Sequence, residues 1–397
     1  EVLEYHYPVE EMEMNFICVN VLTYILGFVI KSGLYKLGIN MNISDEWAQI
    51  LNMKNEFFLS RIVFTNVKKR YISDAVLQEG TLLRDKKTGE IGYPEIKGFD
   101  FKKIAEKRDK TVEKIRKSLE LSVKNCGVTI VYVEAFVQNP KQIKAGEDLF
   151  DVDKIIVATG AKPRELKGIE FDGKFVLSSD DVLQLESLPK SVLIIGSGAI
   201  GIEWARIFSN FGVEVSLVEM AEHLIPLADI EISKRIERIF KQKKIKFYTN
   251  DYVEAINDGI VILKSGLRIQ PDFILSAVGR VPCSVEDEFS EVIGDASGEI
   301  QLAHYASYQA LRLTEGCSKT IDKTLVPSVI YGEPEIAWVG IREQECDETY
   351  TKIMLPITAL GKSWCDDSTE GFIKLIIKDN KLLGAHIVSK EASALIH

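Results

Sequence analysis

The sequence lacks closely spaced cysteines. Its 397 residues include six cysteines, with no C-x-x-C pair and no cluster at the spacing of a zinc site. This distribution is typical of reduced thiols, and it predicts a cytoplasmic protein without a metal centre. The chain begins with Glu1 rather than Met, so we expect a fragment or a processed product.

A membrane-spanning run and an excess of positive charge are also missing. Residues Asn15–Ile30 are uncharged but shorter than the roughly 20 apolar residues that a span requires. Acidic residues precede them, unlike the basic start of a signal peptide, so a buried helix or strand pair is predicted. The net charge of −10 argues against nucleic acid and anionic membranes as partners.

The sequence does contain a dinucleotide-binding pattern in Ser191–Glu219. The apolar run Val192–Ile195 predicts a buried strand, and three glycines follow at the spacing G-x-G-x-x-G. A helical pattern then continues through Phe211, and a second apolar run ends at Glu219. Strand, glycine turn, helix, strand and acid stand in the order of a nucleotide-binding unit; the alternative is a tight strand–helix turn without a ligand.

Each glycine of this pattern has a separate physical role. Gly196 permits the tight turn, Gly198 lets backbone N–H groups approach a pyrophosphate, and Gly201 lets the helix approach the strand. The helix N-terminus adds free N–H donors. Glu219 is placed to accept hydrogen bonds from a ribose 2′-OH, and its charge would repel a 2′-phosphate, so NAD is favoured over NADP.

Other segments predict the remaining architecture. Phe99–Val123 has the period of an amphipathic helix, Val128–Val133 and Ala135–Val137 are interpreted as strands, and Pro140–Glu147 as a surface turn. Four strand-like runs in Val326–His397 indicate a small antiparallel sheet with helices. The length predicts two or three domains.

Several runs together resemble the FAD- and NAD-dependent disulfide oxidoreductases, most closely the dihydrolipoamide dehydrogenases. They occur in that family's order and cover about three-quarters of the chain: KIIVATGAKP, SVLIIGSGAIGIEWARIFSNFGVEVSLVE, FILSAVGRVP, VIGDASG, LAHYA, PSVIYGEPEIAWVG and TEGFIKLIIKDNKLLGAHIVSKEASALIH.

The resemblance implies roles for individual residues in binding NAD and FAD. On the NAD side it implies that the three glycines hold the pyrophosphate and Glu219 the ribose, with Glu203 near the nicotinamide and Gly279 in the run leading back toward the FAD domain. On the FAD side the implied residues are Ala158, Thr159, Gly160, Asp295, Leu302, Ala303 and His304. Asp295 would bond the ribityl chain.

The resemblance also implies a domain plan and partners. The fold class is α/β, with two Rossmann-like nucleotide-binding domains, the first incomplete, and a C-terminal α+β dimerisation domain. The expected ranges are 1–165 for a divergent FAD-binding domain, 166–281 for the NAD-binding domain, 282–322 for a return segment of the FAD domain, and 323–397 for a truncated interface domain. The implied partners are a second copy and a lipoyl-bearing carrier of a 2-oxo acid dehydrogenase complex.

Three departures from the family pattern concern the chemistry. The first G-x-G-x-x-G, which binds FAD in the family, is not found, and the redox C-x-x-x-x-C is incomplete. Cys18 is a weak candidate for half of that disulfide, because Thr23 occupies the second position. The chain also stops at His397, before the family's catalytic His-Pro and Glu. His386 and His397 are not interpreted as the catalytic base.

The predicted function is therefore that of a dihydrolipoyl dehydrogenase-like flavoprotein. Electrons would pass from a dihydrolipoyl dithiol through a disulfide and FAD to NAD⁺, but we expect little or no lipoamide turnover from the chain as given. Two alternatives remain open: a non-catalytic NAD-binding dimeric relative, and an NADH oxidase or diaphorase-like flavoenzyme.

Overall fold

A computed structural model describes residues 83–84, 91–92, 101–284, 288–315 and 321–397. These residues belong to two compact units. The first contains Lys110–Lys162 and the segment from Val281, and the second contains Pro163–Arg280, Ile321–His397 and the described residues up to Asp109. In the described part of the chain, no helix is long and apolar enough to cross a membrane. The segment Asn15–Ile30 lies outside it.

The second unit is built on a five-stranded parallel sheet with the order β11-β10-β9-β15-β8. Its strands are β8 (Val176–Leu177), β9 (Ser191–Ile195), β10 (Glu214–Val218), β11 (Lys246–Tyr248) and β15 (Phe273–Ser276). From β9 the chain runs outward through β10 to β11, then returns to place β15 on the other side of β9. This order confirms the predicted Rossmann-like unit, because it creates a crevice at the carboxyl ends of β9 and β15.

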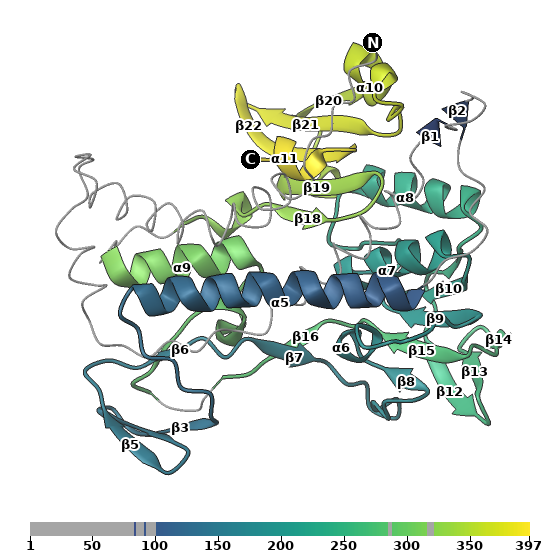
Figure 1. Cartoon of the computed structure of the whole chain (residues 1–397). Helices are drawn as coiled ribbons and strands as arrows, with labels where there is room; N and C mark the ends of the chain where they lie inside the picture. Colours follow the sequence, from purple (N-terminus) through teal and green to yellow (C-terminus); the bar gives the residue numbers. More distant parts are fainter. Residues whose placement is uncertain (1–82, 85–90, 93–100, 285–287, 316–320) are drawn as a thin grey trace. The chain divides into compact units, whose positions relative to one another are not determined.

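Both faces of this sheet are covered (Figure 1). Helices α7 (Ala199–Asn210) and α8 (Ile230–Gln242) lie on one face, and the antiparallel strands β12 (Val253–Asn257), β13 (Ile260–Leu263) and β14 (Arg268–Ile269) lie on the other. Successive residues of β9 therefore enter different hydrophobic clusters, one on the helix side and one on the side of β12–β14. A strand buried on both faces has to be continuously apolar, as β9 is.

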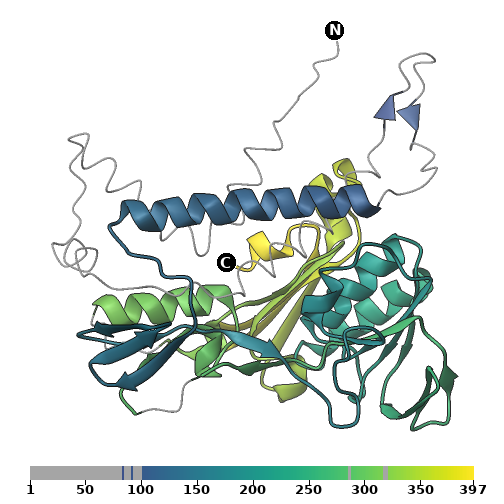
Figure 2. The ribbon, with the colours of Figure 1, turned by 60° about the horizontal axis from the view of Figure 1, so that its bottom comes forward.

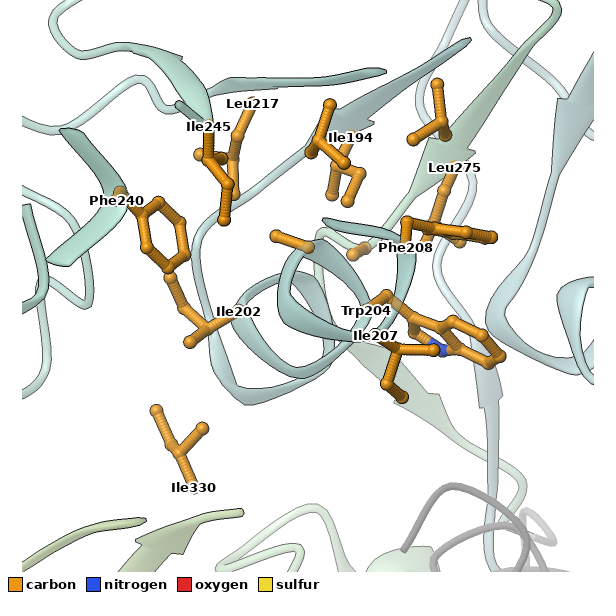
Figure 3. Close-up of a cluster of buried hydrophobic side chains, with 14 of the residues drawn as sticks. Ile194, Ile202, Trp204, Ile207, Phe208, Leu217, Phe240, Ile245, Leu275 and Ile330 are labelled. Atoms are coloured by element: carbon orange, nitrogen blue, oxygen red, sulfur yellow. The ribbon is translucent and has the colours of Figure 1, made fainter. Parts of the chain in front are cut away.

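Helix α7 is surrounded by apolar side chains (Figure 3). Ile194, Leu217 and Leu275 approach it from the parallel strands, whereas Ile330 approaches from the opposite side. Phe208 is fully buried. Because its apolar neighbours surround it, α7 is held in one position, and with it the glycine turn at its N-terminus.

The C-terminal region of the second unit is an antiparallel sheet with the order β18-β19-β22-β21-β20. The strands are β18 (Ser328–Ile330), β19 (Glu335–Gly340), β20 (Thr351–Pro356), β21 (Phe372–Lys378) and β22 (Lys381–Ser389), with helices α10 (Gly361–Cys365) and α11 (Ala392–Leu395). The predicted antiparallel sheet with helices is confirmed, although β19 was not predicted.

Buried charges connect this sheet to the start of α8. Lys374 Nζ lies 2.6 Å from Asp229 Oδ1 and also bonds the Glu343 carboxylate. His386 is buried beside them, and its Nε2 is 2.9 Å from the Ile341 carbonyl oxygen. Burial would raise the pKa of Asp229, but hydrogen bonds from Lys374 and the Glu343 N–H outweigh it and keep that pKa low. The Lys374 hydrogen bond also lowers the pKa of Glu343, whereas burial lowers the pKa of His386.

The first unit contains smaller sheets. Strands β3 (Ala135–Asn139), β4 (Gln142–Ala145) and β5 (Asp148–Asp151) form an antiparallel sheet, drawn in blue in Figure 2. Strands β6 (Ile156–Val157) and β17 (Glu291–Val292) run parallel and lead to the 3₁₀ helix η1 (Gly294–Ser297) and to α9 (Ala303–Glu315). The remaining elements are β1 (Leu83–Arg84), β2 (Ile91–Gly92), α5 (Phe101–Asn125), β7 (Ala161–Pro163), α6 (Ser179–Val182), β16 (Arg280–Pro282), η2 (Lys323–Leu325), η3 (Glu343–Glu345) and η4 (Ile357–Ala359).

Two secondary-structure predictions in the first unit were wrong. Residues Val128–Val133 form no strand, because no other strand in the described part of the chain pairs with them. The predicted turn Pro140–Glu147 contains β4, which is paired on both sides by β3 and β5. The helix predicted at Phe99–Val123 is confirmed as α5.

Leu217 and Leu227 provide a matched test of the core beside α7. Leu217 is fully buried, whereas Leu227 is 75% exposed. Leu217→Ala should lower the free energy of unfolding by about 2–5 kcal/mol through lost burial and a residual cavity, and Leu227→Ala should change it by less than about 0.5 kcal/mol. Urea unfolding followed by tryptophan fluorescence measures both; equal effects would contradict the assigned core.

The buried charges predict a pH dependence of stability. Since the pKa values of Asp229 and Glu343 are below their usual 3.8 and 4.5, their contribution is present above about pH 4.5 and is lost as pH falls through the lowered values. Lys374→Met should cost about 3–5 kcal/mol at pH 7 by leaving the buried Asp229 carboxylate without its cation. The difference in unfolding free energy between this variant and wild type should narrow toward pH 4, where Asp229 of the variant can take up a proton.

Lys246→Met is the control for this measurement, because Lys246 pairs with Glu214 on the surface and both side chains are more than half exposed. Its effect should stay below about 1 kcal/mol at every pH. Urea unfolding between pH 7 and pH 4 measures these effects. If the difference in unfolding free energy between Lys374→Met and wild type did not change with pH, the electrostatic account would be refuted.

Candidate functional site

Two of the three predicted glycines are required by the backbone itself. Gly196 has φ +96°, and a Cβ there would lie 2.8 Å from the Ala277 carbonyl oxygen. A Cβ on Gly201 would lie 1.9 Å from the Gly196 carbonyl oxygen. Because neither position has room for a side chain, Gly201 brings α7 against the turn and Gly196 brings the turn against the end of β15.

Gly198 is different, because its Cβ would meet nothing within 4 Å. It is the N-cap residue of α7, and no side chain caps the helix there. The first backbone N–H groups of an α-helix have no partner within the helix, and they carry the positive end of the helix dipole. The space beside Gly198, at the N-terminus of α7, would be narrowed by a Cβ. Space of this kind at a helix N-terminus fits a pyrophosphate.

The third part of the site is the end of β15. The Ala277 N–H donates to the Ile195 carbonyl oxygen at 2.8 Å, so the segments after β9 and β15 leave the sheet together. Gly279 follows with φ +99° and open space around its Cβ position, and its carbonyl oxygen accepts the Arg164 N–H at 3.0 Å. The predicted residue Gly279 thus lies at the same sheet edge as the glycine turn, across the crevice between β9 and β15.

Glu219 follows β10, the neighbour of β9. Its Oε1 accepts the Ala221 N–H at 2.8 Å, and its Oε2 accepts both the N–H and the hydroxyl of Ser197, at 2.8 and 2.7 Å. The structure therefore brings this carboxylate against the glycine turn, as the sequence pattern predicts. Because a carboxylate oxygen accepts two hydrogen bonds, Oε1 keeps one position for a ribose hydroxyl.

Glu203 lies on the side of α7 that contacts the loop after β18. Its Oε1 accepts the Tyr331 N–H at 3.2 Å. One turn further on, burial lowers the pKa of Arg206 to about 10, although the Glu203 charge acts in the other direction, and Arg206 Nη1 donates to the Pro334 carbonyl oxygen at 2.9 Å. The structure thus shows Glu203 at a contact between α7 and the loop after β18; its position near a nicotinamide stays a prediction.

The predicted FAD residues of the first unit gather at the carboxyl ends of β6 and β17. The Ile293 N–H donates to the Val157 carbonyl oxygen at 2.9 Å, which keeps the two strand ends side by side. Beyond β6, the Thr159 hydroxyl donates to the Cys283 carbonyl oxygen, and the Cys283 N–H donates to the Gly160 carbonyl oxygen at 2.8 Å. Ala158, the first residue after β6, is half-buried.

Asp295 lies in the first turn of η1 and is buried. Gly294, just before it, donates its N–H to Gln309 Oε1 of α9 at 2.7 Å, which links η1 to that helix. The predicted residues Leu302, Ala303 and His304 are all half-buried at the start of α9. A buried acid beside small residues at a strand end suits the hydroxyl groups of a ribityl chain.

Comparisons with known proteins show the family to which the chain belongs. A family model described as pyridine nucleotide-disulphide oxidoreductase matches residues 63–309, and its dimerisation domain matches residues 326–397. The chain belongs to the pyridine nucleotide-disulphide oxidoreductase family. Family membership confirms the α/β fold class and the prediction of FAD and NAD as cofactors. The assignment of individual residues to those cofactors, and the four predicted domain ranges, stay predictions.

Two curated relatives illustrate the similarity. Dihydrolipoyl dehydrogenase from Bacillus subtilis is 33% identical over 63% of this chain and 61% of its own length, and dihydrolipoyl dehydrogenase 2, chloroplastic, from Arabidopsis thaliana is 30% identical over 76% of this chain and 63% of its own length. The chain thus spans about three-fifths of the length of these relatives.

Solved structures support the fold. LpdA from Mycobacterium tuberculosis matches with a TM-score of 0.72 at 21% identity, over 83% of this chain and 81% of its own. The HOCl-induced flavoprotein disulfide reductase RclA from Escherichia coli matches with a TM-score of 0.71, also at 21% identity and over the same shares.

Two further points concern residues outside the predicted set. Cys18 and Thr23 lie outside the described residues, so the incomplete redox pair stays a prediction. Ser197, which bonds Glu219, was not singled out from the sequence. It occupies the variable position between two glycines, and nothing in that local pattern indicates a partner 22 residues away. In the described part of the chain, no group of three or more His, Cys, Asp or Glu residues could hold a metal ion.

Gly201→Ala and Gly198→Ala should distinguish a glycine that the backbone packing requires from one that has open space beside it. The comparison uses the stability of the unliganded protein. The first change forces a Cβ into the Gly196 carbonyl and should cost about 3 kcal/mol of unfolding free energy. The second meets no protein atom within 4 Å and should cost less than about 1 kcal/mol. Thermal and urea unfolding of the unliganded proteins measure the difference, and similar losses would refute the assigned roles.

Proposed function

We propose that this chain binds NAD⁺ across the crevice at the carboxyl ends of β9 and β15. The observation that carries this proposal is the open space at Gly198, between two glycines that the fold cannot replace. The start of α7 would hold the pyrophosphate and Glu219 the adenosine ribose. Glu219 also gives the site negative charge where a 2′-phosphate would lie, so NAD⁺ should bind better than NADP⁺.

The first unit supports a second proposal, an FAD site at the ends of β6 and β17. Thr159, Gly160 and buried Asp295 would hold the ribityl side of the cofactor, with Leu302–His304 bordering the flavin. When bound, FAD would supply hydride exchange with NAD. The glycine motif for the FAD pyrophosphate is not found in the 397-residue sequence, so weak retention of FAD is expected.

The reaction class that fits is that of the dihydrolipoyl dehydrogenases, the activity named for several relatives. Their family chemistry passes electrons through a cysteine pair, and Thr23 cannot form a disulfide with Cys18. We therefore propose a dihydrolipoyl dehydrogenase-like flavoprotein oxidoreductase with little or no turnover of lipoamide by this chain. The missing cysteine is the reason for that low turnover, and electron transfer between NADH and a dye through FAD does not require the cysteine pair.

We also propose that the protein is a cytoplasmic homodimer. The match of residues 326–397 to a dimerisation domain supports this, as do apolar side chains on the surface of that region. Ile353, Met354 and Leu355 of edge strand β20 are 40–51% exposed, and Trp364 is 65% exposed. An exposed apolar edge strand is a surface that a partner usually covers. A lipoyl-bearing carrier is the second proposed partner.

The proposed function is tested by spectroscopy on the purified full chain. As NADH is added, its fluorescence should change along a saturable curve. The visible absorbance band of added FAD should shift relative to that of free FAD. A dye should then be reduced by NADH, whereas lipoamide should not. Rapid lipoamide turnover would contradict the cysteine argument, and a chain that takes up FAD but shows no saturable NADH signal would contradict the assigned NAD site.

Gly198→Ala should weaken NAD⁺ binding about tenfold while leaving the fold intact, because a methyl group enters the space assigned to the pyrophosphate. Isothermal titration calorimetry measures the dissociation constants. Gly361→Ala is the control, since Gly361 also has open space around its Cβ and a φ outside the left-handed region, but lies at the start of α10. An unchanged dissociation constant for Gly198→Ala would place the ligand elsewhere.

A further inference from the structure

Ser197 connects the glycine turn to the acid after β10. Its side chain is fully buried, and its hydroxyl lies 2.7 Å from Glu219 Oε2. The Ser197 N–H donates to the same oxygen at 2.8 Å. One residue therefore supplies both donors to a single carboxylate oxygen.

The direction of the hydroxyl proton follows from a third contact. The Ile225 N–H donates to Ser197 Oγ at 3.1 Å, so the hydroxyl already accepts one hydrogen bond. A serine hydroxyl has a single proton to donate. The acceptor at hydrogen-bonding distance is Glu219 Oε2, and the proton is directed there.

The backbone at Ile225 is strained. Its φ is +54°, in the left-handed region that a β-branched residue rarely occupies, and its side chain is buried. Such a conformation costs of order 1–3 kcal/mol and persists only where the surroundings enforce it. Here it aims a backbone N–H at Ser197 Oγ, which fixes the serine hydroxyl and, through it, the carboxylate.

The orientation of Glu219 decides which oxygen a ligand meets. Oε2 accepts two hydrogen bonds from Ser197 and is filled, whereas Oε1 accepts the Ala221 N–H and has one lone pair left. Without the Ser197 hydroxyl, Oε2 would be less firmly held and the carboxylate could rotate away from the sheet edge.

We propose that Ser197 is a positioning residue for cofactor selection: its hydroxyl, held by Ile225, locks Glu219 so that Oε1 faces the ribose and the charge faces the site of a 2′-phosphate. The inference rests on the proposed NAD⁺ site. Ser197 touches the acid and not the nucleotide, and it acts on the choice between NAD⁺ and NADP⁺ through Glu219.

The test compares Ser197→Ala with wild type in the full chain by calorimetric titration of NAD⁺ and NADP⁺. The dissociation constant for NAD⁺ should rise about fivefold, the scale of one lost hydrogen bond. The constant for NADP⁺ should stay the same or fall, because a displaced carboxylate repels the 2′-phosphate less. The NADP⁺ dissociation constant divided by the NAD⁺ dissociation constant should therefore drop at least fivefold. A general loosening of the fold would weaken both ligands and leave this ratio unchanged.

Ser389→Ala is the matched control. Ser389 is also buried, at the end of β22 in the C-terminal sheet, and its hydroxyl has no hydrogen-bond partner among the described residues. Its removal should change neither constant by more than twofold. In a Glu219→Ala background, Ser197→Ala should likewise have no further effect, because the residue through which it acts is gone.

Ser197→Cys covers the case in which Ser197→Ala fails to fold, since a thiol is only somewhat larger than a hydroxyl, leaves no cavity and is a weak donor. The same drop in the ratio is expected. If wild type binds NAD⁺ and the variants keep its ratio, the inference is overturned and the proposed function stands. If Ser197→Ala weakens NAD⁺ equally with and without Glu219, Ser197 acts independently and the inference fails. If wild type binds no NAD⁺, both fail.

Discussion

The close approach of Gly201 to the Gly196 carbonyl determines where α7 begins, and many contacts of the second unit depend on that position. Because no Cβ intervenes, α7 begins directly against the turn that ends β9. The helix axis then places Phe208 in the core, and it places Glu203 and Arg206 against the segment that leads from β18 to β19. The same contact leaves the space at Gly198 open. Dense packing around α7 and an empty cradle at its N-terminus are thus two results of one backbone contact.

Local chemistry explains which parts of the fold could be predicted from sequence. The unit Ser191–Glu219 was predicted correctly because its strand, turn and helix are specified by neighbouring residues. The strand predicted at Val128–Val133 failed because a β-branched run forms a strand only when another strand pairs with it. Strand β4 was missed for the converse reason, since its short polar sequence is stabilised by β3 and β5 on both sides.

In the candidate site too, some features follow from the local sequence and others depend on distant segments. The glycines and Glu219 have positions along the chain that imply their proximity, and the structure places them together. Likewise, Ala158–Gly160 and Asp295 each follow a strand, and the pairing of β6 with β17 brings them to one edge. The hydrogen bonds that orient these groups, such as the one from Ile225 to Ser197, depend on loop conformations that have no sequence pattern.

The charges buried around Lys374 have a consequence for how such a chain can change over generations. Asp229 is the N-cap residue of α8, Glu343 belongs to η3 and Lys374 lies on β21. Ion pairs through Lys374 therefore connect three segments that are distant in the sequence. Loss of Lys374 leaves the buried Asp229 carboxylate without its cation, and loss of Asp229 leaves the buried Lys374 ammonium with the half-exposed Glu343. Replacing the whole set by apolar residues of similar volume is often tolerated. Viable lineages should therefore alter these positions together or leave them alone, and they should covary despite more than 100 residues of separation between Asp229 and Lys374.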